Sequence, residues 1–131
     1  MHYKKTKEDS IILMRVVSNE EFTKFVNNTL EVSEKKWYND SEGVGYCYAI
    51  DATPEELKAN FSGEKLLVLE VSPKLFASCK RYFGRNYFTR YNNGETGTRS
   101  WDECSREVPF VAETCRSFSV IDMSDIEDIR H

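Results

Sequence analysis

The sequence predicts an α+β fold in which a central split β-sheet or β-sandwich carries two to three short helices. Strand-like and helix-like patterns alternate three times from residue 11 to residue 84, and the rest of the chain is rich in strand-like segments. At 131 residues, with 40% hydrophobic and 13% aromatic residues, the chain is long enough to bury one core. We therefore expect a single domain over residues 1–131, with residues 1–10 as a flexible N-terminal segment.

The first predicted strand covers residues 11–17 and leads directly into a helix. Ser18-Asn19-Glu20-Glu21 has the form of a capping box, in which Ser18 and Glu21 bond the first free amides of the helix. The apolar residues that follow recur at helical spacing and predict one buried face: Phe22, Phe25, Val26 and Leu30. Residues 31–43 are polar around Trp37-Tyr38 and are typical of a long loop.

The middle of the chain repeats this order twice. Residues 44–50 predict a second strand, and Thr53-Pro54-Glu55-Glu56 supplies the N-cap and first turn of a helix. Residues 65–71 are almost continuously apolar and predict a central strand. Ser72-Pro73 then starts a third helix, which we expect to continue to Gly84.

The last third of the chain is predicted to form mostly strands. We expect strands over residues 85–91, 106–112 and 117–122, with a loop over residues 92–97 and a final turn beginning at Ser124.

Charge and cysteine content exclude several classes of protein. The net charge of −4 gives no general attraction for nucleic acid, although basic and aromatic residues alternate between Lys80 and Arg99 and leave a local anion site open. The four cysteines form no C-x-x-C pair, and His2 and His131 are the only histidines, so we expect reduced thiols and no metal. No segment has the length or apolarity of a signal peptide or a membrane span, which predicts a cytoplasmic protein without membrane contact.

Three strand segments carry residues with chemical potential. Arg15 lies within the first strand, where its guanidinium binds a phosphate or ribose, pairs with a carboxylate across the sheet or points to solvent. Tyr46 and Tyr48 lie two residues apart and therefore share one face, where they either stack on a flat heterocycle or pack in the core. Glu107 stands two residues before Pro109, which favours an edge or irregular position in the sheet, where a carboxylate beside a cleft could be catalytic. The alternative is a surface glutamate paired with a nearby arginine.

Glu103 and Glu113 compete with Glu107 for the role of key carboxylate, and the sequence leaves the choice open. No phosphate-binding glycine loop, G-x-S-x-G elbow, H-E-x-x-H motif or cysteine–histidine pair is present. Any chemistry must therefore use Arg, Tyr, Glu, Asp or Ser side chains.

The layout resembles the small ADP-ribosyltransferases found among phage-encoded modifiers, toxins and mobile-element proteins. The resemblance covers residues 11–121 as an order of elements, and it is closest over residues 45–57 and 65–71. It implies an ADP-ribosyltransferase-like fold and NAD as substrate, without a metal. Arg15 would then hold the NAD ribose and phosphate, Tyr46 or Tyr48 would line the nicotinamide pocket, and Glu107 would be catalytic.

The same resemblance implies a mono-ADP-ribosyltransferase, a glycosyltransferase that modifies a host macromolecule, with a host protein favoured over nucleic acid. In a phage-encoded enzyme, the site of action would be the host cytoplasm. The family has an Arg-Ser-Glu subgroup and a His-Tyr-Glu subgroup. Arg15 resembles the first of these subgroups, whereas the strand with Tyr46 and Tyr48 resembles the second. Ser105 stands two residues before Glu107, where arginine-modifying members carry Glu or Gln, so the resemblance does not extend to arginine as acceptor.

Two other functions fit the sequence. One is a non-enzymatic intracellular inhibitor that binds a protein partner through Trp37, Tyr38 and Trp101, with or without a degenerate transferase fold. The other is an RNA- or nucleotide-binding domain that uses the basic and aromatic segment over residues 80–99. The acceptor, the oligomeric state and the activity of the site are left open by the sequence.

Overall fold

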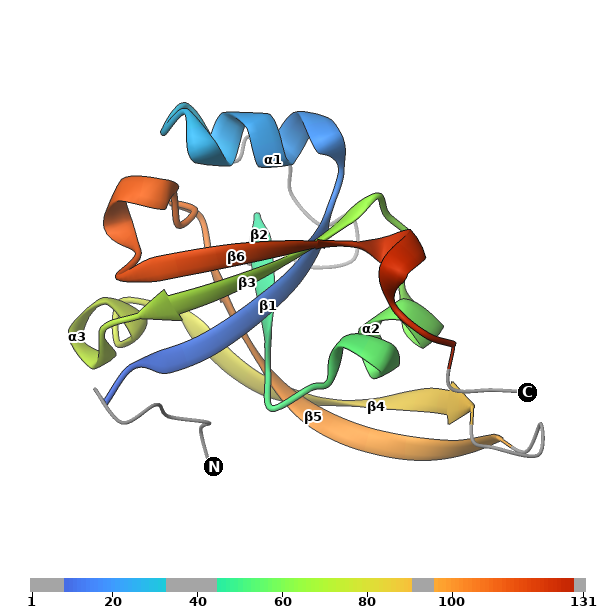
Figure 1. The fold of residues 1–131 in the computed structure, drawn as a ribbon. Coiled ribbons are helices and arrows are strands. Elements are labelled where there is room, and N and C mark those ends of the chain that lie inside the picture. Colours follow the sequence, from blue (N-terminus) through green and yellow to red (C-terminus); the bar gives the residue numbers. More distant parts are fainter. Residues whose placement is uncertain (1–8, 33–44, 91–95, 129–131) are drawn as a thin grey trace.

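The computed structural model describes residues 9–32, 45–90 and 96–128, and its described part is an α+β fold (Figure 1). The expected loop around Trp37-Tyr38 and most of the expected N-terminal segment lie outside the described residues. Six strands form one antiparallel sheet in the order β4-β5-β2-β1-β3-β6. The strands are β1 (Ile11–Val17), β2 (Tyr46–Ile50), β3 (Lys65–Val71), β4 (Arg81–Arg90), β5 (Thr96–Arg106) and β6 (Ser117–Asp122). The α+β class is confirmed, whereas the expected sandwich is replaced by a single sheet.

The sheet is nevertheless weakly joined at one place. β1 pairs with β3 over its full length, and β4 pairs with β5 from Arg81 to Arg90. Between β1 and β2, by contrast, the described residues have only Met14 and Ala49 in register. We call this junction the seam. It divides the sheet into β4-β5-β2 and β1-β3-β6, and Figure 1 shows β6, β3 and β1 running together above β4 and β5.

Three short helices cover the two faces: α1 (Asn19–Val26), α2 (Pro54–Asn60) and α3 (Pro73–Phe76). Alternation along the strands sends Leu13, Leu67 and Leu69 to the face covered by α1 and α3. Met14, Leu66 and Trp101 lie on the other face, where Leu57 of α2 completes the packing. Two 3-10 turns, η2 (Ala112–Thr114) and η3 (Met123–Asp125), lie on either side of β6 in the sequence.

The three α-helices begin at the positions that the sequence predicts. The side-chain oxygens of Ser18, Thr53 and Ser72 each accept a hydrogen bond from the amide three residues later. Thr53 and Glu56 form the full reciprocal box. The box expected at Ser18 is only half present, because the Glu21 carboxylate bonds Arg15 instead of the cap amide.

Two expected elements are wrong, and one strand was missed, because β5 begins at Thr96 inside the loop expected over residues 92–97. The third helix ends at Phe76 and not at Gly84, because the amide of Lys80 donates to the carbonyl of Ser105 at 2.8 Å and starts the long pairing of β4 with β5. The strand expected over residues 106–112 is absent, because β5 ends at Arg106. Pro109 has no amide for a ladder, and the amide of Phe110 donates to the hydroxyl of Tyr48 at 3.2 Å.

Candidate active site

A pocket of about 240 Å³ lies at the seam on the α2 side of the sheet. Strands from both parts of the sheet form its base, and the end of α2 with the two residues after it forms one wall. The residues that line it are Met14, Arg15, Val16, Gly45, Cys47, Ala49, Leu57, Phe61, Ser62, Arg85 and Glu103. The volume is below the roughly 300–1,000 Å³ of clefts that enclose a drug-sized ligand, so the pocket fits one ring system with a small substituent.

Glu103 is the buried carboxylate of this pocket. β5 places it opposite Ala49 of β2, and the residue is only 5% exposed. The Tyr87 hydroxyl donates a hydrogen bond to its Oε2, and Nε of Arg85 lies 3.6 Å from the same oxygen. Burial raises the pKa of Glu103 above its usual range, although the bond from Tyr87 and the charge of Arg85 act in the opposite direction.

Three aromatic rings stand beside the carboxylate. Tyr87 stacks on Trp101 with ring centroids 4.0 Å apart and an interplanar angle of 9°. Phe61, which lines the pocket, meets the Tyr87 ring edge-on at 5.3 Å. Burial first, and then the bond to Glu103, raise the pKa of Tyr87, which therefore stays a protonated hydrogen-bond donor. The pocket thus combines the carboxylate of Glu103, the guanidinium of Arg85 and the aromatic ring of Phe61, with Tyr87 and Trp101 packed behind them.

Arg15 also lines the pocket, but its guanidinium is already engaged. Nε and Nη2 donate to the two carboxylate oxygens of Glu21 at 2.7 and 3.1 Å, and Nη1 donates to the carbonyl of Cys47 at 3.1 Å. The arginine therefore connects β1, α1 and β2 across the seam. Burial alone would lower the pKa of Arg15, but the bond and charge of Glu21 raise it overall, so the side chain stays cationic.

The two predicted tyrosines both lie against Arg15. Its guanidinium carbon is 5.2 Å from the ring centroid of Tyr46 and 5.9 Å from that of Tyr48. Tyr48 is 2% exposed and packs edge-on against Phe110 at 5.0 Å, and burial raises its pKa strongly. Its ring is therefore a core group. Tyr46 is half-buried, and its hydroxyl donates to the carbonyl of Glu31 at 3.2 Å.

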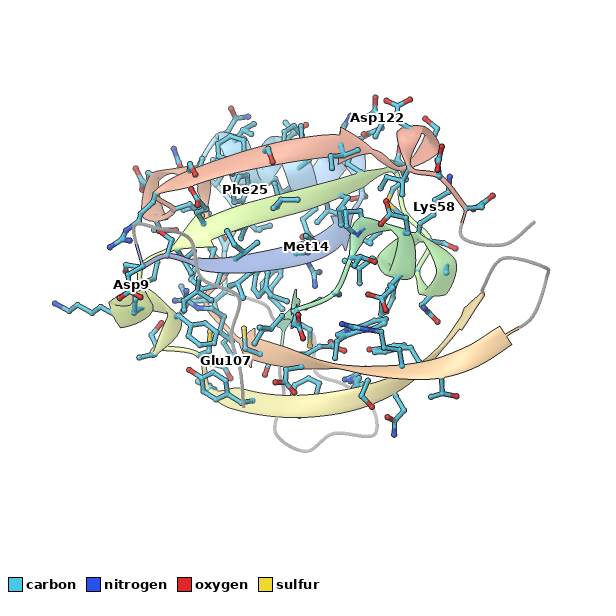
Figure 2. The ribbon with its side chains drawn as sticks, turned by 60° about the horizontal axis from the view of Figure 1, so that its bottom comes forward. Asp9, Met14, Phe25, Lys58, Glu107 and Asp122 are labelled. Atoms are coloured by element: carbon cyan, nitrogen blue, oxygen red, sulfur yellow. The ribbon has the colours of Figure 1, made fainter. Side chains whose placement is uncertain are left out.

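Glu107 does not line the pocket. It follows the end of β5, and its Oε2 pairs with Nζ of Lys80 at 2.9 Å. Figure 2 places Glu107 near the end of β5, apart from Met14 in the middle of the sheet. Glu113 is exposed beyond β5, where its amide donates to the side chain of Asn28. Of the three carboxylates that the sequence left open, Glu103 is the one in the pocket.

The basic residues of the segment 80–99 whose side chains are described pair with carboxylates. Lys80 pairs with Glu107, Arg85 with Glu103, and Nε of Arg99 with Glu56 at 2.9 Å. The last pair ties β5 to the first turn of α2 and so holds one wall of the pocket. Because these carboxylates neutralise the positive charges of the segment, it is less suited to bind a polyanion such as a nucleic acid.

The sequence alone did not identify Phe61 as part of a site, and it grouped Arg85 and Tyr87 only with the basic and aromatic segment over residues 80–99, not with Glu103. A usable signal was present in β5, where Glu103 alternates with Trp101 and must share its face with an aromatic residue. Arg85 and Tyr87 lie in the strand expected over residues 85–91, but they could not be placed beside Glu103 because β5, the strand that pairs with it, was not expected.

The four cysteines are free. Burial raises the pKa of Cys115 to about 11, while the contact of Cys79 with Cys104 lowers the pKa of the former and raises that of the latter. Within the described ranges, no group of three or more His, Cys, Asp or Glu side chains could hold a metal ion.

Comparisons of the chain with protein-family models, with curated proteins and with solved structures found no match. In the described part of the chain, no helix is both long and apolar enough to span a membrane.

Proposed function

We propose that the chain is an NAD-dependent mono-ADP-ribosyltransferase whose site is the pocket at the seam, with Glu103 as its key carboxylate. The observation that carries the proposal is that Arg15 and the buried Glu103 both line the pocket at the seam, with the Arg15 side chain on the α1 side of the sheet and the Glu103 carboxylate on the α2 side. The pattern that resembles this family requires an arginine on the first strand and a glutamate on a late strand. Glu103 meets that requirement better than Glu107, which pairs with Lys80 outside the pocket.

The proposed reaction depends on the positive charge that develops when the bond is cleaved. Cleavage of the bond between nicotinamide and ribose develops positive charge on the ribose, and a nearby carboxylate stabilises that charge. Glu103 would provide the carboxylate, and Tyr87 would hold it in place through its hydrogen bond. Phe61 would pack against the nicotinamide ring, because it is the aromatic residue that lines the pocket.

Arginine side chains would hold the rest of the dinucleotide. Arg85 lines the pocket and has a side chain that is 49% exposed, so its guanidinium can reach a phosphate outside. Arg15 donates three of its five N–H groups to Glu21 and Cys47 on the α1 side of the sheet, so its other two would have to meet the ribose or phosphate through the seam. The acceptor would be a macromolecule of the host, with a protein favoured.

The test compares two glutamate variants in one assay. Purified protein is mixed with NAD labelled on its adenylate group and with a host lysate, and nicotinamide release is measured in parallel without lysate. We expect Glu103→Gln to reduce both signals about 10²- to 10³-fold, the usual effect of removing a group that stabilises transition-state charge. Glu107→Gln should retain most of the activity. Loss of activity in Glu107→Gln alone would return the catalytic role to Glu107, and absence of both signals in the parent protein would refute the proposal.

A second candidate function is a non-enzymatic protein-binding module built on a degenerate transferase fold. The observation that favours it is the Arg15–Glu21 pair, since a guanidinium committed to a neighbouring carboxylate can be purely structural. Calorimetry with NAD separates the two functions. Heat of binding that is lost in Arg85→Ala supports the enzyme, whereas no heat at millimolar NAD supports the binding module.

A further inference from the structure

The two edges of the sheet differ in a way that the proposed function does not explain. β4, at one edge, carries Arg81, Arg85 and Arg90 along its length. β6, at the other edge, is uncharged from Ser117 to Ile121, and no described strand lies beyond it. Exposed edge strands usually carry charges, a proline or a bulge that prevents pairing with another chain. The uncharged part of β6 has no such protection.

β6 also exposes apolar side chains. Phe118 is 39% exposed and Val120 is 38% exposed, and strand alternation places both on the α1 side of the sheet. α1 covers them only in part, through an edge-on contact of Phe25 with Phe118 at 5.0 Å. In Figure 2, β6 is the outermost strand on its side of the sheet, and Asp122 lies at its far end.

The backbone of β6 is suited to a further strand. The amide of Met123 donates to the carbonyl of Glu64 at 3.1 Å and continues the register in which Lys65 faces Asp122. Odd-numbered residues of β6 therefore bond to β3, and the amides and carbonyls of Phe118 and Val120 point to the open edge.

We propose that β6 pairs with β6 of a second copy of this chain, antiparallel and centred on Ser119, so that two sheets join into one across a two-fold axis. In this register Phe118 lies opposite Val120 of the second copy, and their outward amides and carbonyls bond each other. This is an aromatic and β-branched pair, a combination that stabilises neighbouring strands. The two-fold axis repeats every contact, which makes the interface self-complementary.

Charge complementarity supports the same register. Arg116 precedes the uncharged segment and Asp122 ends it, and both residues are exposed. Pairing centred on Ser119 brings Arg116 of each copy to the end of the paired segment near Asp122 of the other, although the amide of Arg116 donates to the carbonyl of Glu70 at 2.8 Å and takes no part in the new ladder. These contacts add to the existing bonds of Arg116 to Ser10 at 2.9 Å and of Asp122 to Lys65 at 2.8 Å.

The expected association is weak, because two short edges bury less than the roughly 1,200 Å² typical of stable interfaces. We therefore expect a dissociation constant of about micromolar size or weaker. The interface uses neither the pocket nor the seam, so the dimer and the proposed activity can be tested separately.

Sedimentation equilibrium over about a hundredfold range of concentration tests the dimer, since such a range spans most of a two-state association curve. The parent chain should dimerise, Val120→Lys should stay monomeric, and Val108→Lys should dimerise like the parent. Val108 is a matched control because it is 53% exposed and lies outside β6. Circular dichroism confirms the fold of each variant.

A charge exchange tests the register. Arg116→Asp should weaken association about tenfold or more, and the double change Arg116→Asp with Asp122→Arg should restore it, because attraction between the copies returns with its sign reversed. A monomeric parent chain would overturn the proposal and leave the edge to a different partner. A dimer that survives Val120→Lys would overturn the use of β6, and failure of the double change to restore association would overturn the register.

Discussion

The two parts of the sheet on either side of the seam have different kinds of sequence. β1 and β3 are mostly apolar, and Leu13, Leu66 and Leu69 among them are 0% exposed. β5, on the other side, carries Glu103, Ser105 and Arg106, and β4 is interrupted by arginines. The first part is specified mainly by burial, and the second holds polar groups whose positions depend on one another. The comparison teaches that burial specifies β1 and β3, whereas the buried carboxylate of the candidate site lies in β5, and Arg15 of β1 brings the two parts together at the seam.

The largest effect on stability is expected at the centre of β3. Leu69→Ala removes a fully buried side chain and should lower the free energy of unfolding by about 2–5 kcal/mol, since the surrounding core closes the cavity only in part. Urea denaturation followed by fluorescence measures the change. Val108→Ala, on an exposed side chain just after β5, should stay within about 0.5 kcal/mol of the parent. A loss below about 1 kcal/mol in Leu69→Ala would contradict the assignment of stability to this part of the sheet.

Breaking the ion pair at the seam should lower the free energy of unfolding by a smaller amount. Glu21→Ala leaves the half-buried Arg15 guanidinium without its bidentate partner and should cost about 1.5–3 kcal/mol, the range for hydrogen bonds to charged groups. Glu20→Ala is the matched control in the same helix, because it breaks only the exposed pair with Lys24, worth about 0.3–0.5 kcal/mol. Equal losses in the two variants would mean that Arg15 does not hold the two parts of the sheet together.

The two parts also differ in how far they could be predicted from sequence. β1, β3 and the start of α2 were predicted because apolar runs and capping residues are local signals that tertiary contacts reinforce. The boundary between α3 and β4 was missed because Leu75, Phe76 and Cys79 fit a helical stripe, while pairing with β5 is invisible along the chain. Long-range pairing overrides local pattern in that region.

The candidate site also shows which features are local in the sequence and which depend on long-range pairing. Arg15 was predicted to be either a ligand group or half of an ion pair, and the structure provides the carboxylate in Glu21, from a residue that had been assigned to a cap. Glu103 could be named as a candidate but not chosen, because its burial depends on the register of β5 against β2 and β4. The sequence identified which residues could take part in chemistry. It could not predict their burial and partners, on which their chemistry depends.

The smallest expected effect is a change of stability with pH at Glu103. Because burial raises its pKa in the folded state, the folded protein holds this proton to a higher pH than the unfolded chain does. The proton therefore favours the folded state at acid pH, and the parent loses this contribution as pH rises from about 4, the value for a free glutamate, through the raised pKa. Glu103→Gln carries no such charge.

The difference in unfolding free energy between Glu103→Gln and the parent should therefore shift in favour of the variant as pH rises across this window, and then level off. Urea denaturation of both proteins from pH 4 to pH 8 measures it, with Glu107→Gln as the control for removal of one carboxylate near the end of β5. A difference that does not change with pH would mean that Glu103 is solvated in solution, and the pocket would then lack the buried carboxylate that separates β5 from the apolar strands across the seam.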